Sequence, residues 1–156
     1  MARFSTRQPG RLIRRARLDA GLTQSELASR AGISQPSLAQ MERDTRTPSD
    51  EMLERVLRAA DYRPSLPLAD FASQISALAA KRGIERVRVF GSIVRGEDHF
   101  DSDIDLLVSP RPHVDLLDLA LFAEEVRVMT GFPVDVVADT SDAPRVIDAA
   151  REAVGL

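Results

Sequence analysis

The 156-residue chain has no cysteine and only two histidines, His99 and His113. Without cysteine, disulfide bonds and thiolate metal sites are excluded, and this composition is typical of the reducing cytoplasm. Two isolated histidines do not indicate a zinc site. No apolar run approaches the roughly 20 residues that a membrane-spanning helix needs, and the N-terminus lacks the apolar segment typical of a secretion signal. We therefore expect a cytoplasmic protein with no membrane partner.

Net charge is low, at −3, but charge is distributed unevenly along the chain. Residues 1–65 carry 12 arginines against 8 acidic residues, a net charge of +4, whereas residues 66–156 carry 9 basic against 16 acidic residues, or −7. A basic first part favours a polyanionic partner, and an acidic second part favours cations. Two prolines near the junction favour an extended path that ends helices. We therefore predict two domains, residues 1–63 and residues 64–156.

Glycines and helix-capping residues divide the first domain into short helices. Gly21 ends the first helix, and Thr23-Gln24-Ser25-Glu26 has the form of a capping box that starts the second. Another glycine ends that helix, and Ser34 is a suitable N-cap for a third helix over residues 35–42. A fourth helix is predicted from Ser49. Short helices joined by a tight glycine turn predict a helix-turn-helix layout.

The outward side of the third helix carries small or amide-bearing side chains with little charge. A glutamine amide can pair with N6 and N7 of adenine in the major groove, whereas bulky side chains would block entry. Arginines around this surface could neutralise phosphates; they are Arg14, Arg15, Arg17, Arg43 and Arg46. A helical bundle used only for protein contacts is the alternative interpretation.

Residues 10–62 resemble the Cro/phage-repressor (XRE) family, most clearly in residues 21–28 and 32–42. The resemblance implies that the domain binds an operator in double-stranded DNA, as a homodimer on two half-sites. It further implies that the third helix contacts base edges, while Gln24 and the turn after the third helix contact the DNA backbone. The expected DNA-binding residues are Gln24, Gln35, Pro36, Ser37, Gln40, Arg43 and Arg46.

A glycine–serine turn and a pair of aspartates dominate the second domain. Gly91-Ser92 follows a strand predicted over residues 86–90, and Asp103-Ile104-Asp105 begins a second strand over residues 104–109. Residues two apart in a strand point to the same side, about 6.6–6.8 Å apart, so the two carboxylates project together. Paired carboxylates suit Mg²⁺, and the N–H groups and hydroxyl of the turn suit phosphate. This combination predicts nucleotide chemistry.

A third acid lies in a later apolar strand, predicted over residues 134–138. An unpaired charge in a buried strand would be costly, so Asp135 is expected either to join the other two carboxylates, if the strands are neighbours, or to face solvent at the strand end. Helices are predicted over residues 68–79, 113–129 and 143–154. The expected fold is α+β: an all-α helix-turn-helix domain followed by a small α/β domain with a mixed sheet.

The long helix predicted over residues 113–129 is more apolar than one small sheet requires. Its core stripe is expected at Leu116, Leu119, Phe122, Ala123, Val126 and Met129. Additional apolar residues indicate a protein interface; they are Val114, Leu117, Leu121 and Val128.

The second domain resembles the nucleotidyltransferase superfamily that includes polymerase beta, and most closely its minimal (MNT) branch. The resemblance rests on Gly91-Ser92, a ten-residue gap, Asp103-Ile104-Asp105, Arg95-Gly96 and Asp135. It implies a Mg²⁺-dependent enzyme with ATP as donor, in which Asp103, Asp105 and Asp135 are catalytic and hold two Mg²⁺ about 3.5–4 Å apart. Gly91 and Ser92 would hold the terminal phosphates, and Arg95 would offset charge on the pyrophosphate.

Minimal nucleotidyltransferases are typically encoded beside HEPN-type proteins, as antitoxins that transfer AMP to a tyrosine of the toxin. Together with the repressor-like domain, the resemblance implies a toxin–antitoxin protein that modifies a HEPN-type toxin and regulates its own operon. Two alternatives stay open. The transferase domain could be catalytically silent and only sequester a toxin or sense nucleotide, or it could transfer a nucleotide to a small molecule such as an aminoglycoside.

Overall fold

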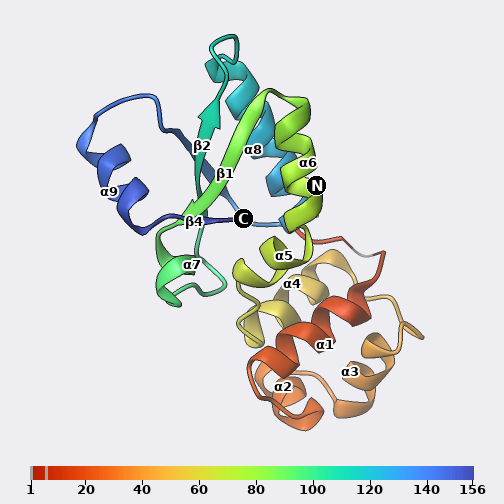
Figure 1. Ribbon diagram of the computed structural model, residues 1–156. Coiled ribbons are helices and arrows are strands. Elements are labelled where there is room, and N and C mark those ends of the chain that lie inside the picture. The colour runs from red at the N-terminus through yellow and green to blue at the C-terminus, as the bar shows by residue number, and fades with distance from the viewer. Residues whose placement is uncertain (1, 6) are drawn as a thin grey trace. The chain divides into compact units, whose positions relative to one another are not determined.

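The computed structural model describes residues 2–5 and 7–156. The chain divides into two compact units, Met1–Arg63 and Pro64–Leu156, which are considered separately below (Figure 1). Within the described residues, no helix combines the length and the apolar character that crossing a membrane requires.

The described residues of the first unit form four helices, α1 (Pro9–Asp19), α2 (Gln24–Ala31), α3 (Gln35–Glu42) and α4 (Asp50–Ala59). The predicted N-caps Thr23 and Ser34 are present, and Ser49 also caps α4. Each of these side chains accepts a hydrogen bond from a backbone N–H in the first turn. Apolar side chains of all four helices fill the core, including Ile13, Leu27, Leu38, Met41, Leu53 and Leu57, each at most 1% exposed.

The second unit is built around a mixed four-stranded sheet, as expected. Its strands are β1 (Ile84–Phe90), β2 (Ile104–Pro110), β3 (Val134–Ala138) and β4 (Val154–Gly155), in the order β3-β2-β1-β4. β1 pairs antiparallel with β2 and with β4, whereas β2 and β3 are parallel. The helices are α5 (Ser65–Asp70), α6 (Ala72–Lys81), α7 (Ser92–Arg95), α8 (Leu116–Thr130) and α9 (Pro144–Glu152).

Helices cover both faces of this sheet. α6 packs on β1 and α8 packs on β3, on one side, while α9 packs on β1 and β2 from the other side (Figure 1). On the α9 side, Val146 and Ala149 contact Phe90 and Leu107 in a buried cluster. Because side chains alternate along a strand, Asp105 shares the α9 side with Leu107, so α9 lies over the face that carries the acidic residues.

Two predicted elements differ from the structure. The junction is not extended, because Pro64 and Ser65 begin α5, and prolines fit the first turn of a helix where no N–H is needed. The single helix predicted over residues 68–79 is two helices, since Phe71 has non-helical angles (φ −102°, ψ 8°) between α5 and α6.

Two further predictions are corrected at α8 and α9. Leu116, assigned to the core stripe, is 84% exposed because it is the first residue of α8. The last helix ends at Glu152 rather than 154, because Ala153 is extended and the following residues pair with β1. The apolar residues assigned to a protein interface include Leu117, Leu121 and Val128, which are 66%, 43% and 53% exposed.

Candidate functional sites

The turn after β1 brings the glycine–serine pair against Asp105, the aspartate on β2. Gly91 has a positive φ of 76°, and a Cβ at this position would overlap the Asp105 carboxylate. Only glycine fits such a position without strain, both for its backbone angle and for the close approach. Ser92 begins the short helix α7 and is half-buried. The predicted phosphate-binding turn therefore lies directly beside one of the predicted catalytic acids.

Strand pairing brings the acidic residues together. Asp105 is half-buried on β2, and its register partner on the parallel strand β3 is Asp135. Asp103, two residues before Asp105, is exposed. The pKa of Asp105 is raised, chiefly by burial and then by the negative charges of Asp135 and Asp103, while Arg145 and Arg95 oppose the shift. The charges of Asp103 and Asp135 therefore both act on Asp105.

The carboxylate of Asp135 is bound by the guanidinium of Arg145, which projects from the first turn of α9. Among the described residues, no three His, Cys, Asp or Glu side chains are grouped closely enough to hold a metal ion. For the three acids to form the predicted metal site, Asp135 must release Arg145 and bind the ion instead. A divalent cation suits the donor set, since oxygen ligands are what Mg²⁺ prefers and positive charge would relieve the repulsion at Asp105.

The predicted phosphate-binding groups are occupied by a carboxylate that the sequence analysis did not identify. The N–H of Gly91 donates to Oε1 of Glu152 at 2.8 Å, and Nη1 of Arg95 lies 3.3 and 3.2 Å from its two carboxylate oxygens. Arg95 also donates from Nε to Glu97 at 2.9 Å. Arg145 and Glu152 were therefore missed, although their spacing of seven residues, which places both on one side of a helix, was visible in the sequence.

A second polar group lies further along the same side of the sheet. Asp139, just after β3, accepts hydrogen bonds from Arg88 on β1 and from the Ser109 hydroxyl on β2. The carboxylate is thus neutralised within the fold, and it ties three adjacent segments together. Asp139 therefore serves the sheet rather than the acidic site.

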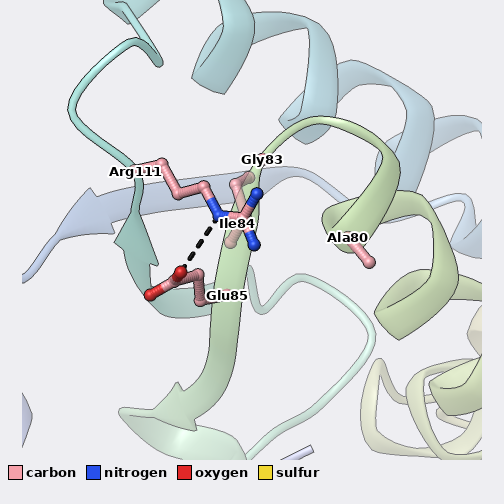
Figure 2. A pocket seen from close by; sticks show the side chains of 5 residues that line it. All are labelled: Ala80, Gly83, Ile84, Glu85 and Arg111. Atoms are coloured by element: carbon pink, nitrogen blue, oxygen red, sulfur yellow. Dashed lines mark hydrogen bonds and ion pairs between the residues drawn. The ribbon is translucent and has the colours of Figure 1, made fainter.

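A surface hollow of about 310 Å³ lies at the opposite end of β1 from Gly91. Figure 2 shows its lining, in which Nε of Arg111 donates to Glu85 at 3.0 Å across the strand. Both charged side chains are exposed, at 58% and 61%, and they satisfy each other. The hollow is thus separate from the acidic residues, and its two charged side chains form an ion pair with each other.

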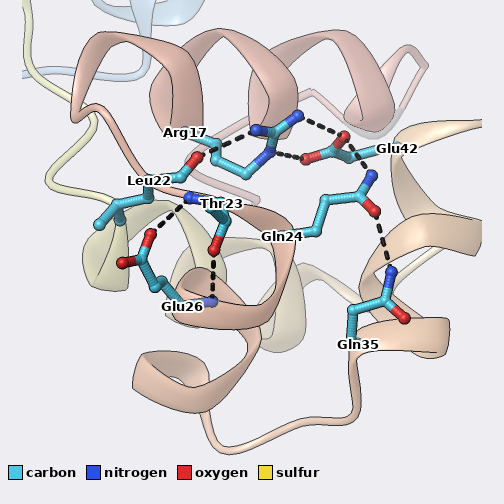
Figure 3. A network of polar contacts seen from close by, with 7 residues as sticks. All are labelled: Arg17, Leu22, Thr23, Gln24, Glu26, Gln35 and Glu42. Atoms are coloured by element: carbon cyan, nitrogen blue, oxygen red, sulfur yellow. Dashed lines mark hydrogen bonds and ion pairs between the residues drawn. The ribbon is translucent and has the colours of Figure 1, made fainter.

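In the helical unit, a chain of hydrogen bonds runs from the interior to the surface (Figure 3). Arg17 on α1 binds both carboxylate oxygens of Glu42, at 2.5 and 3.1 Å, and donates to the Leu22 carbonyl at 3.0 Å. Gln24 donates to Glu42 at 2.9 Å and accepts from Gln35 at 3.0 Å. Burial raises the pKa of Glu42, but the bonds from Arg17 and Gln24 outweigh it, so the net shift is downward.

The chain of bonds corrects one prediction and orients two candidate residues. Arg17, predicted among the phosphate-neutralising arginines, is an internal ion-pair partner with a side chain only 13% exposed. Gln24 is half-buried within the chain, and Gln35 is its exposed end. The Gln35 amide is thereby held through its nitrogen, which leaves its oxygen and one N–H directed to solvent.

The remaining DNA-binding candidates lie at the surface of α3 and the turn after it. Pro36, Gln40, Arg43 and Arg46 are exposed, and Ser37 is half-buried. Arg46 donates to the Ser37 hydroxyl at 3.3 Å, and Ser34 and Ser37 share a hydrogen bond of 2.9 Å. Amides and hydroxyls thus cover one side of α3, with cationic side chains at its end, an arrangement that suits base edges flanked by phosphates.

Comparisons with known proteins match two separate parts of the chain. Residues 13–66 match the helix-turn-helix family model, and residues 72–153 match the nucleotidyltransferase domain model. A candidate protein adenylyltransferase of Methanocaldococcus jannaschii is 36% identical over 75 residues, which are 48% of this chain and 81% of that protein. The protein adenylyltransferase MntA of Thermococcus cleftensis is 38% identical over 64 residues, 41% of this chain and 65% of that protein. The solved structure of a candidate minimal nucleotidyltransferase is similar at a TM-score of 0.54 with 39% identity, covering 59% of this chain and 95% of that chain.

Proposed function

Because the chain belongs to the nucleotidyltransferase domain family and carries a helix-turn-helix domain ahead of it, we propose that it transfers AMP from ATP to a hydroxyl of a partner protein. The observation that carries this proposal is the register of β2 and β3, which pairs Asp105 with Asp135 beside the Gly91 turn. The names of both curated relatives, each a protein adenylyltransferase, support the choice of a protein as acceptor.

Each residue of the site takes one role in this proposal. Asp103, Asp105 and Asp135 would hold Mg²⁺, which would stabilise the charge that develops on the reacting oxygens. The N–H of Gly91 and the hydroxyl of Ser92 bind the terminal phosphates, and Arg95 offsets the charge of the departing pyrophosphate. Asp135 helps to remove the proton of the acceptor hydroxyl, whose oxygen bonds to the α-phosphorus as the bond to pyrophosphate breaks.

The acceptor that best suits the whole chain is a tyrosine of a HEPN-type toxin. The transferase unit is about 90 residues long, and Asp103 at its acidic site is exposed. An open site of this kind needs a partner protein to present the hydroxyl and to exclude water. The helix-turn-helix unit would bind operator DNA as a homodimer and regulate the operon that encodes both proteins.

Label transfer tests the enzymatic proposal. With α-labelled ATP, Mg²⁺ and the protein encoded beside this one, label is expected on that partner. Asp103→Asn and Asp105→Asn should each reduce transfer by about 10³-fold or more, since removing groups that act on the transition state together costs several orders of magnitude. Asp142→Asn, which changes the same charge at an exposed position, is the matched control and should transfer normally.

Operator binding by the two active-site variants should equal that of the unsubstituted protein, and their circular dichroism spectra should match its spectrum, which shows that both units are folded. If label transfer survives both aspartate changes, the site is wrong. If no label moves while the partner's toxicity is still neutralised by binding, the catalytically silent alternative is correct.

A further inference from the structure

The last helix and strand fix the position of Glu152. β4 pairs antiparallel with β1 so that Val154 lies opposite Val89. This pairing brings the end of α9 beside the turn after β1, where the Gly91 N–H donates to Oε1 of Glu152 at 2.8 Å. The backbone on both sides of this hydrogen bond is therefore positioned by regular structure.

The groups that hold Glu152 are those that the proposed function assigns to phosphate. Arg95 contacts both of its oxygens, and the Gly91 N–H contacts one. Carboxylate and phosphate oxygens accept the same charge-assisted hydrogen bonds from guanidinium and backbone N–H groups. One anion can therefore replace the other at this position, but both cannot occupy it together.

At the other end of α9, the positively charged Arg145 lies where the proposed function places a metal ion. Its guanidinium binds Asp135, one of the carboxylates assigned to Mg²⁺. Arg145 and Glu152 are seven residues apart on one helix, about 10 Å along its axis. Val146 and Ala149, between them, are buried against Phe90 and Leu107. The helix is thus anchored by apolar contacts and presents a cation and an anion to two parts of one site.

We propose that α9 is an autoinhibitory segment, in which Glu152 occupies the position of the donor phosphates and Arg145 that of a metal ion. The proposal rests on the proposed function for the identity of the site. A Mg²⁺–nucleotide complex must displace both side chains before it can bind. Nucleotide can bind only to molecules in which Glu152 and Arg145 have left these positions, so its apparent affinity falls in proportion to the fraction of such molecules. A partner that moves α9 away from the site would activate the enzyme.

Nucleotide binding by the full-length chain tests the segment directly. A nonhydrolysable ATP analogue is titrated in the presence of Mg²⁺, and its dissociation constant is measured by equilibrium dialysis. Glu152→Gln and Glu152→Ala should each tighten binding about fivefold, the scale of one charge-assisted contact at a partly exposed site. Arg145→Gln should lower the Mg²⁺ concentration needed for half-saturation by a similar factor, because Asp135 is released.

Two neighbours on the same helix provide matched controls. Asp148 and Arg151 contact each other and have side chains 74% and 76% exposed, so Asp148→Asn and Arg151→Gln change the charge of α9 without touching the site. These two variants should bind nucleotide as the unsubstituted chain does. Equal or weaker binding by both Glu152 variants overturns autoinhibition, and weaker Mg²⁺ binding by Arg145→Gln overturns the assignment of Arg145 to the position of a metal ion.

The outcomes also separate this proposal from the function on which it rests. If the Glu152 variants bind nucleotide more tightly but label reaches no partner, autoinhibition stands and the proposed acceptor is wrong. If label reaches the partner but binding is the same in all variants, only autoinhibition fails. Failure of every variant to bind the analogue overturns both.

Discussion

The two units use their charged side chains in different ways. In the helix-turn-helix unit, the Arg17–Glu42 pair is internal, and Gln24 extends it to Gln35 at the surface. In the transferase unit, the charged groups of the site are paired across it, Arg145 with Asp135 and Arg95 with Glu152. The first unit therefore holds its contact surface ready for a ligand, whereas the second must exchange internal partners for external ones. Ion pairs contribute to rigidity in one unit and to control of access in the other.

The largest effect that tests this difference is expected at the internal ion pair. Arg17→Ala leaves Glu42, whose side chain is only 5% exposed, without its cation. Removing one partner of a buried pair leaves an uncompensated charge, so the free energy of unfolding of the helical unit should fall by about 3 kcal/mol. Urea denaturation followed by circular dichroism would measure the loss.

A double variant distinguishes the ion pair from simple loss of packing. Arg17→Met combined with Glu42→Met removes both charges and should recover much of the loss, because an apolar pair of similar volume avoids the desolvation cost. Arg127→Gln, at the surface pair with Glu124, should leave stability nearly unchanged. A small loss in Arg17→Ala would mean that the two units do not differ in how they use ion pairs.

Substitutions on the surface of α3 should affect DNA binding differently for amide and for cationic side chains. Gln40→Ala removes an exposed amide and is expected to reduce discrimination between the operator and altered sequences by about 1–3 kcal/mol. Arg46→Ala removes a phosphate-neutralising charge and should weaken binding to all sequences, with a salt slope lower by about one. Fluorescence anisotropy at several salt concentrations separates the two effects. A Gln40 variant that changes only the salt slope would contradict base recognition.

Local sequence rules were sufficient for much of this architecture. The Thr23 capping box, the Ser34 cap and the mixed sheet were predicted, and the family comparisons confirm the combination of a helix-turn-helix domain with a nucleotidyltransferase domain. These features depend on side chains within four residues of the backbone they cap, or on motif spacing along one segment. Such information is contained in the sequence itself.

Features that depend on contacts between distant segments were not predicted. Glu152 is 61 residues from Gly91 in sequence, and they meet because α9 packs on β1 and β4 pairs with β1. Arginine is a common phosphate-binding residue, but Arg17 pairs with Glu42, 25 residues away, and this ion pair determines its role. Phe71 ends α5 although the apolar periodicity continues through it, so periodicity alone predicted one helix where there are two.

Capping boxes occur in both units and offer an intermediate test. Thr23 accepts from the Glu26 N–H at the start of α2, and Asp115 accepts from the Asp118 N–H at the start of α8. Thr23→Ala and Asp115→Ala should each cost about 1 kcal/mol of stability, measured by urea denaturation. Comparing the two losses of stability shows whether the units differ in local stability as well as in ion pairing. Similar losses would restrict the difference between them to the ion pairs.

The smallest expected effect concerns the acid at the centre of the transferase site. Burial and the charges of Asp135 and Asp103 raise the pKa of Asp105 above its ordinary value of 3.8. The folded chain therefore holds this proton more tightly than the unfolded chain, so ionised Asp105 lowers the free energy of unfolding above its raised pKa. That cost disappears as the pH falls through the raised pKa to 3.8. At neutral pH, Asp105→Asn should stabilise the fold by about 0.5 kcal/mol, the scale for like charges on adjacent strands.

Urea denaturation of this variant and of the unsubstituted protein at pH 7 and near pH 4 would measure the difference, with Asp142→Asn as the exposed control. The gain should be present at pH 7 and should shrink as the pH falls through the raised pKa of Asp105 toward 3.8, because the protonated carboxyl resembles the amide. A loss of stability at pH 7 would mean that Arg145 and Arg95, which oppose the shift, already compensate Asp105 fully. A gain would mean instead that the fold retains a carboxylate that destabilises it, which is expected of a residue that serves catalysis.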